Sequence, residues 1–161
     1  MEIKINGAEI KELDVHTDDR GLLMEFLRND DPIFQDFGQV YLTLVKAGVA
    51  KGWHYHKMQD DHFVCVGGTA LVVLSDQRED SPTKGVTQEF ILSAPELEGN
   101  HWLVKIPKGV FHGFSTYNCP EAKIVNIPTK AFNYQEPDEY RVAWDSPEVD
   151  YKWPEQIVRG G

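Results

Sequence analysis

The chain carries three histidines within nine residues, His54, His56 and His62, and a fourth, His112, much further along. Imidazole is the side chain best suited to bind a transition metal or to transfer a proton near neutral pH. Because residues i and i+2 of a β-strand point to the same face, His54 and His56 are expected to project together. A single histidine in a strand is most often a half-buried polar residue, but two on one face with others nearby favour a functional pocket.

Two chemical interpretations of this cluster remain open. In the first, His54, His56 and His112, together with Asp61 or His62, bind one divalent transition metal such as Fe, Mn, Ni or Zn. In the second, no cofactor is needed, and one imidazole acts as a general base with a pKa near the working pH.

The elements that must position these residues are short strands. β-prone runs occur at regular spacing between turns that contain Gly or Pro, which is typical of an antiparallel sandwich or barrel. The only helix candidate is GLLMEFLR at 21–28, and the polar, aromatic, proline-broken end at 133–161 is expected to wrap the barrel. We predict one all-β domain over residues 1–161, a jelly-roll barrel with few short helices, whose strands include 40–45, 62–66, 70–74, 87–92, 102–106 and 122–127.

The charge balance disfavours several classes of partner. Sixteen Lys and Arg against 26 Asp and Glu give a formal net charge of −10, so binding to nucleic acid or to a membrane surface is not expected. A local basic pocket could still bind a small anionic ligand. Cys65 and Cys119 do not have the spacing of a disulfide framework or a zinc knuckle. No apolar signal segment or membrane span is evident, so we expect a cytoplasmic protein.

The histidine-bearing segments resemble the two motifs of the cupin superfamily. The run 48–68, GVAKGWHYHKMQDDHFVCVGG, is similar to the first motif, with Asp61 where cupins usually carry Glu. The run 107–112, PKGVFH, is similar to the core of the second motif. This resemblance implies a small β jelly roll with its site inside the barrel.

A second set of segments, spread over residues 16–154, carries a narrower resemblance. These segments are DDRGLLME at 18–25, FGQ at 37–39, GVAKGWHY at 48–55, SPTKG at 81–85, IPKGVFHGF at 106–114 and WDSP at 144–147. In their order and spacing, rather than in any one segment, they resemble the dTDP-4-dehydrorhamnose 3,5-epimerase family. Members of that family remove a proton next to the C4 ketone of a nucleotide-linked 4-keto-6-deoxy sugar and return it on the opposite face, without a metal.

Carried over position by position, the resemblance implies roles for individual residues. His54 stands at the catalytic base position and His112 in the pocket, while Lys51 replaces an Arg that contacts phosphate. Family members are typically dimers whose N-terminal segment contributes to the neighbouring site, so a homodimer is expected. The positions that hold the nucleotide and its diphosphate in the family are Arg20, Glu25 and Gln39, of which the first two would act in trans.

Three chemical positions differ from the family pattern. His56 stands where the family has Gln, and His62 where it has a pocket Lys. Asn126 stands where a tyrosine acts as the acid, with Tyr134 nearby as a further substrate-binding candidate. These differences make the standard double epimerisation doubtful. They leave His56, His62 and His112 as candidates for the partner acid or the enolate stabiliser.

We therefore favour an isomerase, either an epimerase or a ketoisomerase, that acts on a nucleotide-linked keto sugar in surface polysaccharide biosynthesis. One alternative is a metal-dependent cupin enzyme whose ligands are His54, His56, Asp61 or His62, and His112. The other alternative is a sugar- or nucleotide-binding cupin without catalytic activity.

Overall fold

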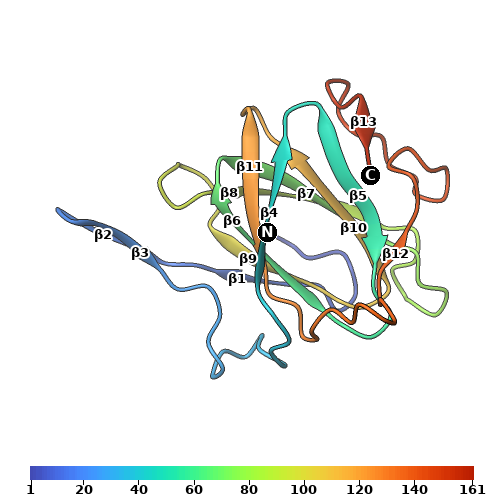
Figure 1. The fold of residues 1–161 in the computed structure, drawn as a ribbon, viewed down its shortest axis with the longest axis horizontal. Coiled ribbons are helices and arrows are strands. Elements are labelled where there is room, and N and C mark those ends of the chain that lie inside the picture. The colour runs from blue at the N-terminus through green and yellow to red at the C-terminus, as the bar shows by residue number, and fades with distance from the viewer.

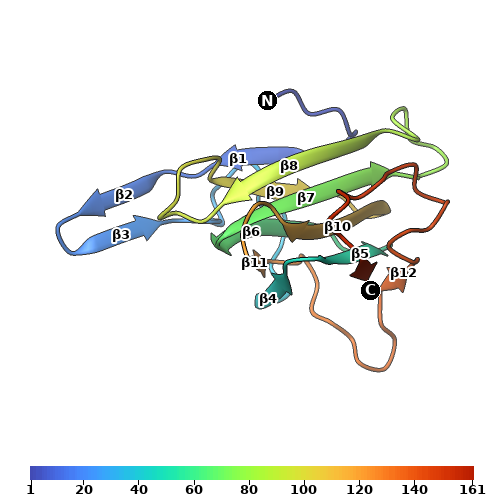
Figure 2. The same cartoon turned by 90° about the horizontal axis from the view of Figure 1, so that it is seen from above.

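The computed structural model describes residues 1–161 as thirteen β-strands joined by turns and loops, with no helix (Figure 1). Most strands belong to two large sheets, and a two-stranded hairpin projects away from them (Figure 2). The all-β prediction is confirmed, whereas the few short helices that we expected do not form. The structure contains no helix of the length and apolarity that a membrane span requires.

The first sheet has the strand order β1-β9-β6-β11-β4, and every neighbouring pair is antiparallel. Each predicted run in this sheet forms a strand, and no end of a run differs from the strand by more than one residue. Its strands are β1 (Glu9–Glu12), β9 (Trp102–Ile106), β6 (Asp61–Gly67), β11 (Glu121–Asn126) and β4 (Tyr41–Lys46).

The second sheet has the order β12-β5-β10-β7-β8, again antiparallel, and β13 (Arg159–Gly160) adds to β5 in parallel. The residues between the first and second cupin-like segments form strands of both sheets, and the chain then returns so that β5 and β10, distant in sequence, become neighbours. The strands are β12 (Tyr140–Arg141), β5 (Val49–Tyr55), β10 (Val110–Thr116), β7 (Thr69–Asp76) and β8 (Thr87–Ser93).

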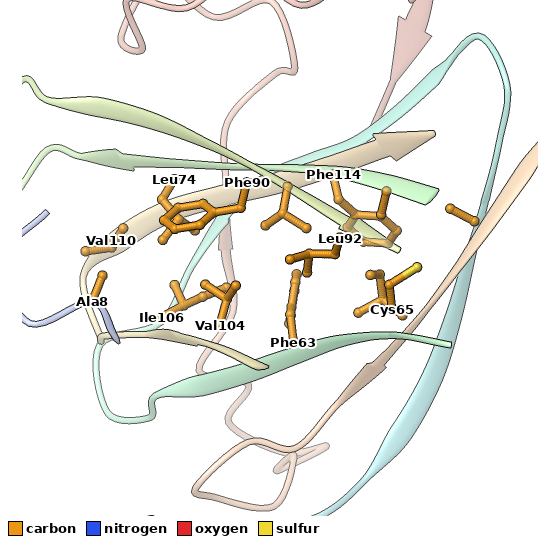
Figure 3. Packing of buried hydrophobic residues seen from close by; sticks show 14 of the residues in the cluster. Ala8, Phe63, Cys65, Leu74, Phe90, Leu92, Val104, Ile106, Val110 and Phe114 are labelled. Atoms are coloured by element: carbon orange, nitrogen blue, oxygen red, sulfur yellow. The ribbon is translucent and has the colours of Figure 1, made fainter. Parts of the chain in front are cut away.

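Apolar side chains from both sheets form the main core, a cluster of 16 buried residues. Phe90 and Leu92 of β8 meet Val104 and Ile106 of β9 in this cluster (Figure 3). Burial of such surface contributes about 25 cal/mol per Å², which makes it the main driving force for folding. Phe63 and Phe114 of the same cluster also border a polar cavity, so the core supports the site directly.

The helix predicted at 21–28 is wrong. Its first half is β3 (Gly21–Met24), which pairs with β2 (Val15–Asp18) in the projecting hairpin. Asp18 and Gly21 are paired across a two-residue turn, where the Asp18 carboxylate accepts a hydrogen bond from the Arg20 backbone N–H at 2.8 Å. Gly21 has φ of 140°, a conformation that favours glycine, so local turn chemistry outweighs the helix propensity of the leucines.

The C-terminal segment at 133–161 wraps the outer face of the second sheet, as predicted. Trp53 of β5 and Trp153 lie with ring centroids 5.1 Å apart, and both indole N–H groups donate to the Trp144 carbonyl. Tyr140 stacks on Tyr55 at 5.1 Å. Most C-terminal aromatic residues therefore cover the barrel.

Candidate active site

A cavity of about 410 Å³ lies between the two sheets, beside the apolar core. It combines imidazoles, carboxylates, two cations and aromatic rings, which is typical of a small-molecule site. The lining residues are Gln39, Tyr41, Thr43, Lys51, His54, His56, Gln59, Asp61, Phe63, His112, Phe114, Phe132, Tyr134, Glu139 and Arg141.

Three of the histidines meet in this cavity because of strand pairing. His54 of β5 is the direct cross-strand partner of His112 of β10, and their ring centroids are 5.5 Å apart. His56 follows β5 two residues after His54, on the same side, and its ring lies 5.5 Å from that of His112. Pairing of β5 with β10 therefore brings together imidazoles that are far apart in sequence.

Asp61 is the buried carboxylate at the centre of the cluster. Its Oδ2 lies 3.2 Å from His56 Nε2 and 3.4 Å from His112 Nε2, while Oδ1 accepts a hydrogen bond from Gln59 at 2.9 Å. Burial alone would raise the pKa of Asp61, but hydrogen bonds from His112 and His56 outweigh it and hold the pKa well below its ordinary value. Asp61 is therefore an anion at neutral pH.

His56 has oxygen atoms at both ring nitrogens, an arrangement that favours its protonated form. Burial lowers its pKa, but the hydrogen bond and charge of Asp61 outweigh burial, so the pKa of His56 is raised overall. Its Nδ1 contacts the Asp138 carbonyl while Nε2 faces Asp61. Because both ring nitrogens face oxygen acceptors, both carry protons in the imidazolium form.

His54 has the opposite character. Burial lowers its pKa to about 3, and the charges of His112 and Arg141 act in the same direction. Its buried Nδ1 has no hydrogen-bond partner in the protein. His54 is therefore a neutral imidazole with an unengaged nitrogen, the state that a general base requires.

Two further cations line the cavity. Lys51 Nζ donates to Thr43 Oγ1 at 2.7 Å, a neutral partner that leaves the ammonium charge uncompensated. Arg141 donates to Glu139 at 2.7 Å. Positive charge at Lys51 and His56 suits a ligand that carries phosphate or develops an enolate.

The same cluster could hold a divalent metal ion. One ligand atom from each of His56, Asp61 and His112 lies within 4.8 Å of the others, and His54 is not part of this set. The Nδ1 atoms of His56 and His112 contact the backbone carbonyls of Asp138 and Val110, which leaves both Nε2 atoms directed at Asp61. Metal-binding histidines commonly have their second nitrogen anchored in this way, so the residues fit a two-histidine, one-carboxylate site.

Comparison with known proteins identifies the family of this chain. The family model described as dTDP-4-dehydrorhamnose 3,5-epimerase matches residues 2–159. The chain belongs to this family. It is 39% identical over 149 residues, 92% of this chain and 96% of the relative, to "Spore coat polysaccharide biosynthesis protein SpsL" of Bacillus subtilis (strain 168). It is 36% identical over 155 residues, 95% of this chain and 97% of the relative, to "Probable low-salt glycan biosynthesis epimerase Agl13" of Haloferax volcanii.

A solved member of the family has the same fold. The dTDP sugar isomerase from Desulfovibrio desulfuricans G20 superposes with a TM-score of 0.86 at 29% identity, and the match covers 95% of this chain and 94% of that one. The predicted family and its cupin jelly roll are therefore confirmed.

Two residues that the family pattern placed in the pocket lie outside its lining. Asp61 and Phe63 of β6 face the cavity, so His62 between them faces the other side of the sheet, where its Nδ1 contacts the Ile127 carbonyl at 2.8 Å. The expectation that His62 supplies pocket chemistry is therefore corrected by strand alternation. Asn126 is fully buried behind Tyr41 rather than exposed to the cavity.

Arg20 lies in the turn of the projecting hairpin, and Glu25 lies directly after β3. Arg20 is paired with Asp18, and Glu25 lies 3.5 Å from Arg28. Neither lines the cavity, whereas Gln39, Lys51 and Tyr134 do so.

Sequence reasoning missed several lining residues, chiefly Tyr41, Thr43, Glu139 and Arg141. Alternation along β4 places Tyr41 and Thr43 on the same face as the core residue Val45, which is a signal available in the sequence. Arg141 lies on a two-residue strand within the irregular C-terminal segment, where no periodicity could have indicated its direction.

Proposed function

We propose that this chain is an isomerase that acts next to the ketone of a nucleotide-linked 4-keto sugar, in the biosynthesis of a surface polysaccharide or glycan. Family membership supports the sugar-nucleotide class, and the names of the two curated relatives support the polysaccharide context. The observation that carries the chemistry is His54, a neutral imidazole that lines a cavity together with the cations Lys51 and Arg141.

His54 acts as the base in this mechanism. It takes the proton from the carbon next to the ketone, and the C–H electron pair moves toward the carbonyl to form an enolate. The His56 imidazolium and the Lys51 ammonium are donors suited to stabilise that negative oxygen in a buried cavity. The substrate diphosphate adds negative charge to the site, which raises the proton affinity of His54 in the complex.

The nucleotide end of the substrate occupies the mouth of the cavity, where Lys51 contacts phosphate and Gln39 and Tyr134 border the ligand. Two copies form a homodimer. Arg20 and Glu25 then reach the cavity of the neighbouring subunit, since the hairpin that carries them projects away from its own sheets (Figure 2).

Deuterium exchange tests this function directly. The chain is incubated with dTDP-4-dehydro-6-deoxyglucose in heavy water, and NMR follows deuterium at C3 and C5. We expect incorporation at one or both carbons, and at least a ~100-fold loss of exchange in His54→Gln. His101→Gln, on a loop outside the cavity, is the matched control. Binding of dTDP by the wild-type chain without exchange would instead identify a non-catalytic sugar- or nucleotide-binding protein.

A metal-dependent cupin enzyme is the second candidate, because the Nε2 atoms of His56 and His112 converge on Asp61 with both Nδ1 atoms anchored. A metal bound there would polarise a ligand oxygen as a Lewis acid. Metal analysis of the purified protein separates the candidates. A stoichiometric transition metal that is lost in His56→Ala with His112→Ala would support the metal site, and exchange at full rate after chelation would reject it.

A further inference from the structure

We propose that Tyr41 is the proton donor that completes inversion on the face of the sugar opposite His54. This inference rests on the proposed function, because it assigns the second proton transfer of the same reaction. Tyr41 begins β4, and its phenol lines the cavity.

The two sheets place Tyr41 and His54 on different walls. Tyr41 belongs to β4 of the first sheet, whereas His54 and His112 belong to β5 and β10 of the second. The cavity lies between these sheets, so a ligand in it has the imidazoles on one side and the phenol on the other. Inversion of a carbon centre requires that the proton leave from one face and return to the other, and this placement meets that requirement.

The hydrogen bonds behind Tyr41 leave its proton available. Asn126 is the cross-strand partner of Tyr41, and its Nδ2 donates to the phenol oxygen at 2.8 Å. The Asn126 Oδ1 accepts the His62 backbone N–H at 3.1 Å, which fixes the orientation of the amide. The phenol therefore accepts from Asn126, and its own O–H remains free to donate into the cavity.

The ionisation state of Tyr41 agrees with a donor role. Burial, helped by the charge of Asp61, raises the pKa of Tyr41 to about 12, so the phenol is protonated at neutral pH. The other tyrosine at the cavity, Tyr134, is 89% exposed, against 43% for Tyr41, and its ring contact is with Phe132. A donor that lies mostly in solvent is a weaker candidate. Exclusion of water from the reacting carbon ensures that the proton comes from the protein donor, and therefore from one face.

Proton exchange with water completes the proton balance of the reaction. His54 removes the carbon proton, and the enolate electron pair then forms a new C–H bond with the Tyr41 proton as the ketone is restored. The resulting tyrosinate regains a proton from water, and the His54 imidazolium releases one to water, so no net proton is consumed.

The ratio of exchange to inversion tests the assignment. Wild-type chain, Tyr41→Phe and Tyr117→Phe are compared with dTDP-4-dehydro-6-deoxyglucose in heavy water, with inversion followed by NMR coupling constants and dTDP affinity by calorimetry. Tyr117, exposed and outside the cavity, is the matched control. In Tyr41→Phe we expect inversion to fall at least ~100-fold, while His54 still exchanges deuterium with retention and dTDP binds as in wild type.

Asn126→Asp provides a second variant that leaves the phenol in place. A carboxylate at this position accepts the Tyr41 O–H and withdraws its proton from the cavity, so exchange without inversion is again expected. This readout identifies Asn126 as a positioning residue, since a purely structural defect would lower exchange and inversion together.

Three results would overturn the assignment. A wild-type rate of inversion in Tyr41→Phe would reject the role of Tyr41 and leave the proposed function intact. Loss of inversion in Tyr134→Phe, with normal inversion in Tyr41→Phe, would assign the donor to Tyr134. No exchange in the wild-type chain would reject the proposed function and the role of Tyr41 with it.

Discussion

His56 Nε2 lies 3.2 Å from Asp61 Oδ2, and this contact connects the strand that carries the histidines to the opposite sheet. Asp61 raises the pKa of His56, and His56 contributes to lowering that of Asp61, so each group keeps the other ionised. The cavity thus holds a buried carboxylate and an imidazole of raised pKa beside the neutral His54. His54, the proposed base, is thus a different residue from His56, which is suited to stabilise negative charge on the substrate.

Asp61→Asn should lower the pKa of His56, because burial then acts without the carboxylate that opposes it. His56 would lose its proton at a lower pH than in wild type, and the rate of isomerisation would fall about 100-fold as the cationic donor is lost. NMR titration of the imidazole nitrogens measures the first effect. Asp60→Asn, whose carboxylate accepts the Lys108 N–H outside the cavity lining, is the control. An unchanged His56 titration in Asp61→Asn would contradict this coupling.

Asp76 should make stability depend on pH at the turn between β7 and β8. Its buried carboxylate accepts hydrogen bonds from Arg78 at 2.8 Å, Ser81 and Thr83 at 2.7 Å. Burial raises its pKa, but these bonds outweigh burial and lower it overall. A lowered folded-state pKa stabilises the protein above the unfolded value near 4, and this stabilisation is lost as the pH falls through the folded-state value.

Asp76→Asn is therefore expected to reduce the free energy of unfolding by about 2–3 kcal/mol at pH 7, and by progressively less below about pH 4. Urea denaturation at pH 7 and pH 3 measures the difference. Asp80→Asn, on an exposed turn residue, should change stability little at either pH. A loss of equal size at both pH values would show that packing, rather than charge, explains the effect.

The longer strands of the two sheets were predictable because each run between turns was rich in β-branched and aromatic residues, and the family pattern identified the fold. The position of His62 was not predictable from alternation alone. Both faces of β6 are buried, Phe63 and Cys65 in the main core and Val64 against Leu103 on the other face. When both faces are apolar, the period of two does not indicate which one borders the cavity.

The pairing within the site depended on tertiary structure. The sequence suggested Asp61 as a metal ligand but did not indicate its partners. In the structure Asp61 contacts His56 and His112, whereas the Nδ1 of His54 is unpartnered. Tyr41 and Asn126, 85 residues apart, interact because β4 and β11 are neighbours. Such contacts follow from register, which local sequence does not determine.

The projecting hairpin is expected to form part of a dimer interface. Leu22 and Leu23 are 44% and 57% exposed in the single chain, and two such residues on an isolated hairpin would be covered by a second copy. Leu22→Ser with Leu23→Ser should weaken dimerisation, as measured by analytical ultracentrifugation over a concentration series. Leu97→Ser, exposed on another loop, is the control. A monomeric wild-type protein, or an unaffected dimer in the double variant, would contradict the expected interface.

Trp153 should stabilise the strands that carry the base. It is 8% exposed, packs on Trp53 of β5, and its ring would lie 3.2 Å from a Cβ added to Gly113, next to His112. Trp153→Ala leaves a cavity at this junction and is expected to cost about 3–5 kcal/mol in the free energy of unfolding. Chemical denaturation measures the loss, with Val158→Ala, 73% exposed, as the control. Equal stability of the two variants would mean that the C-terminal segment does not hold β5 and β10 together.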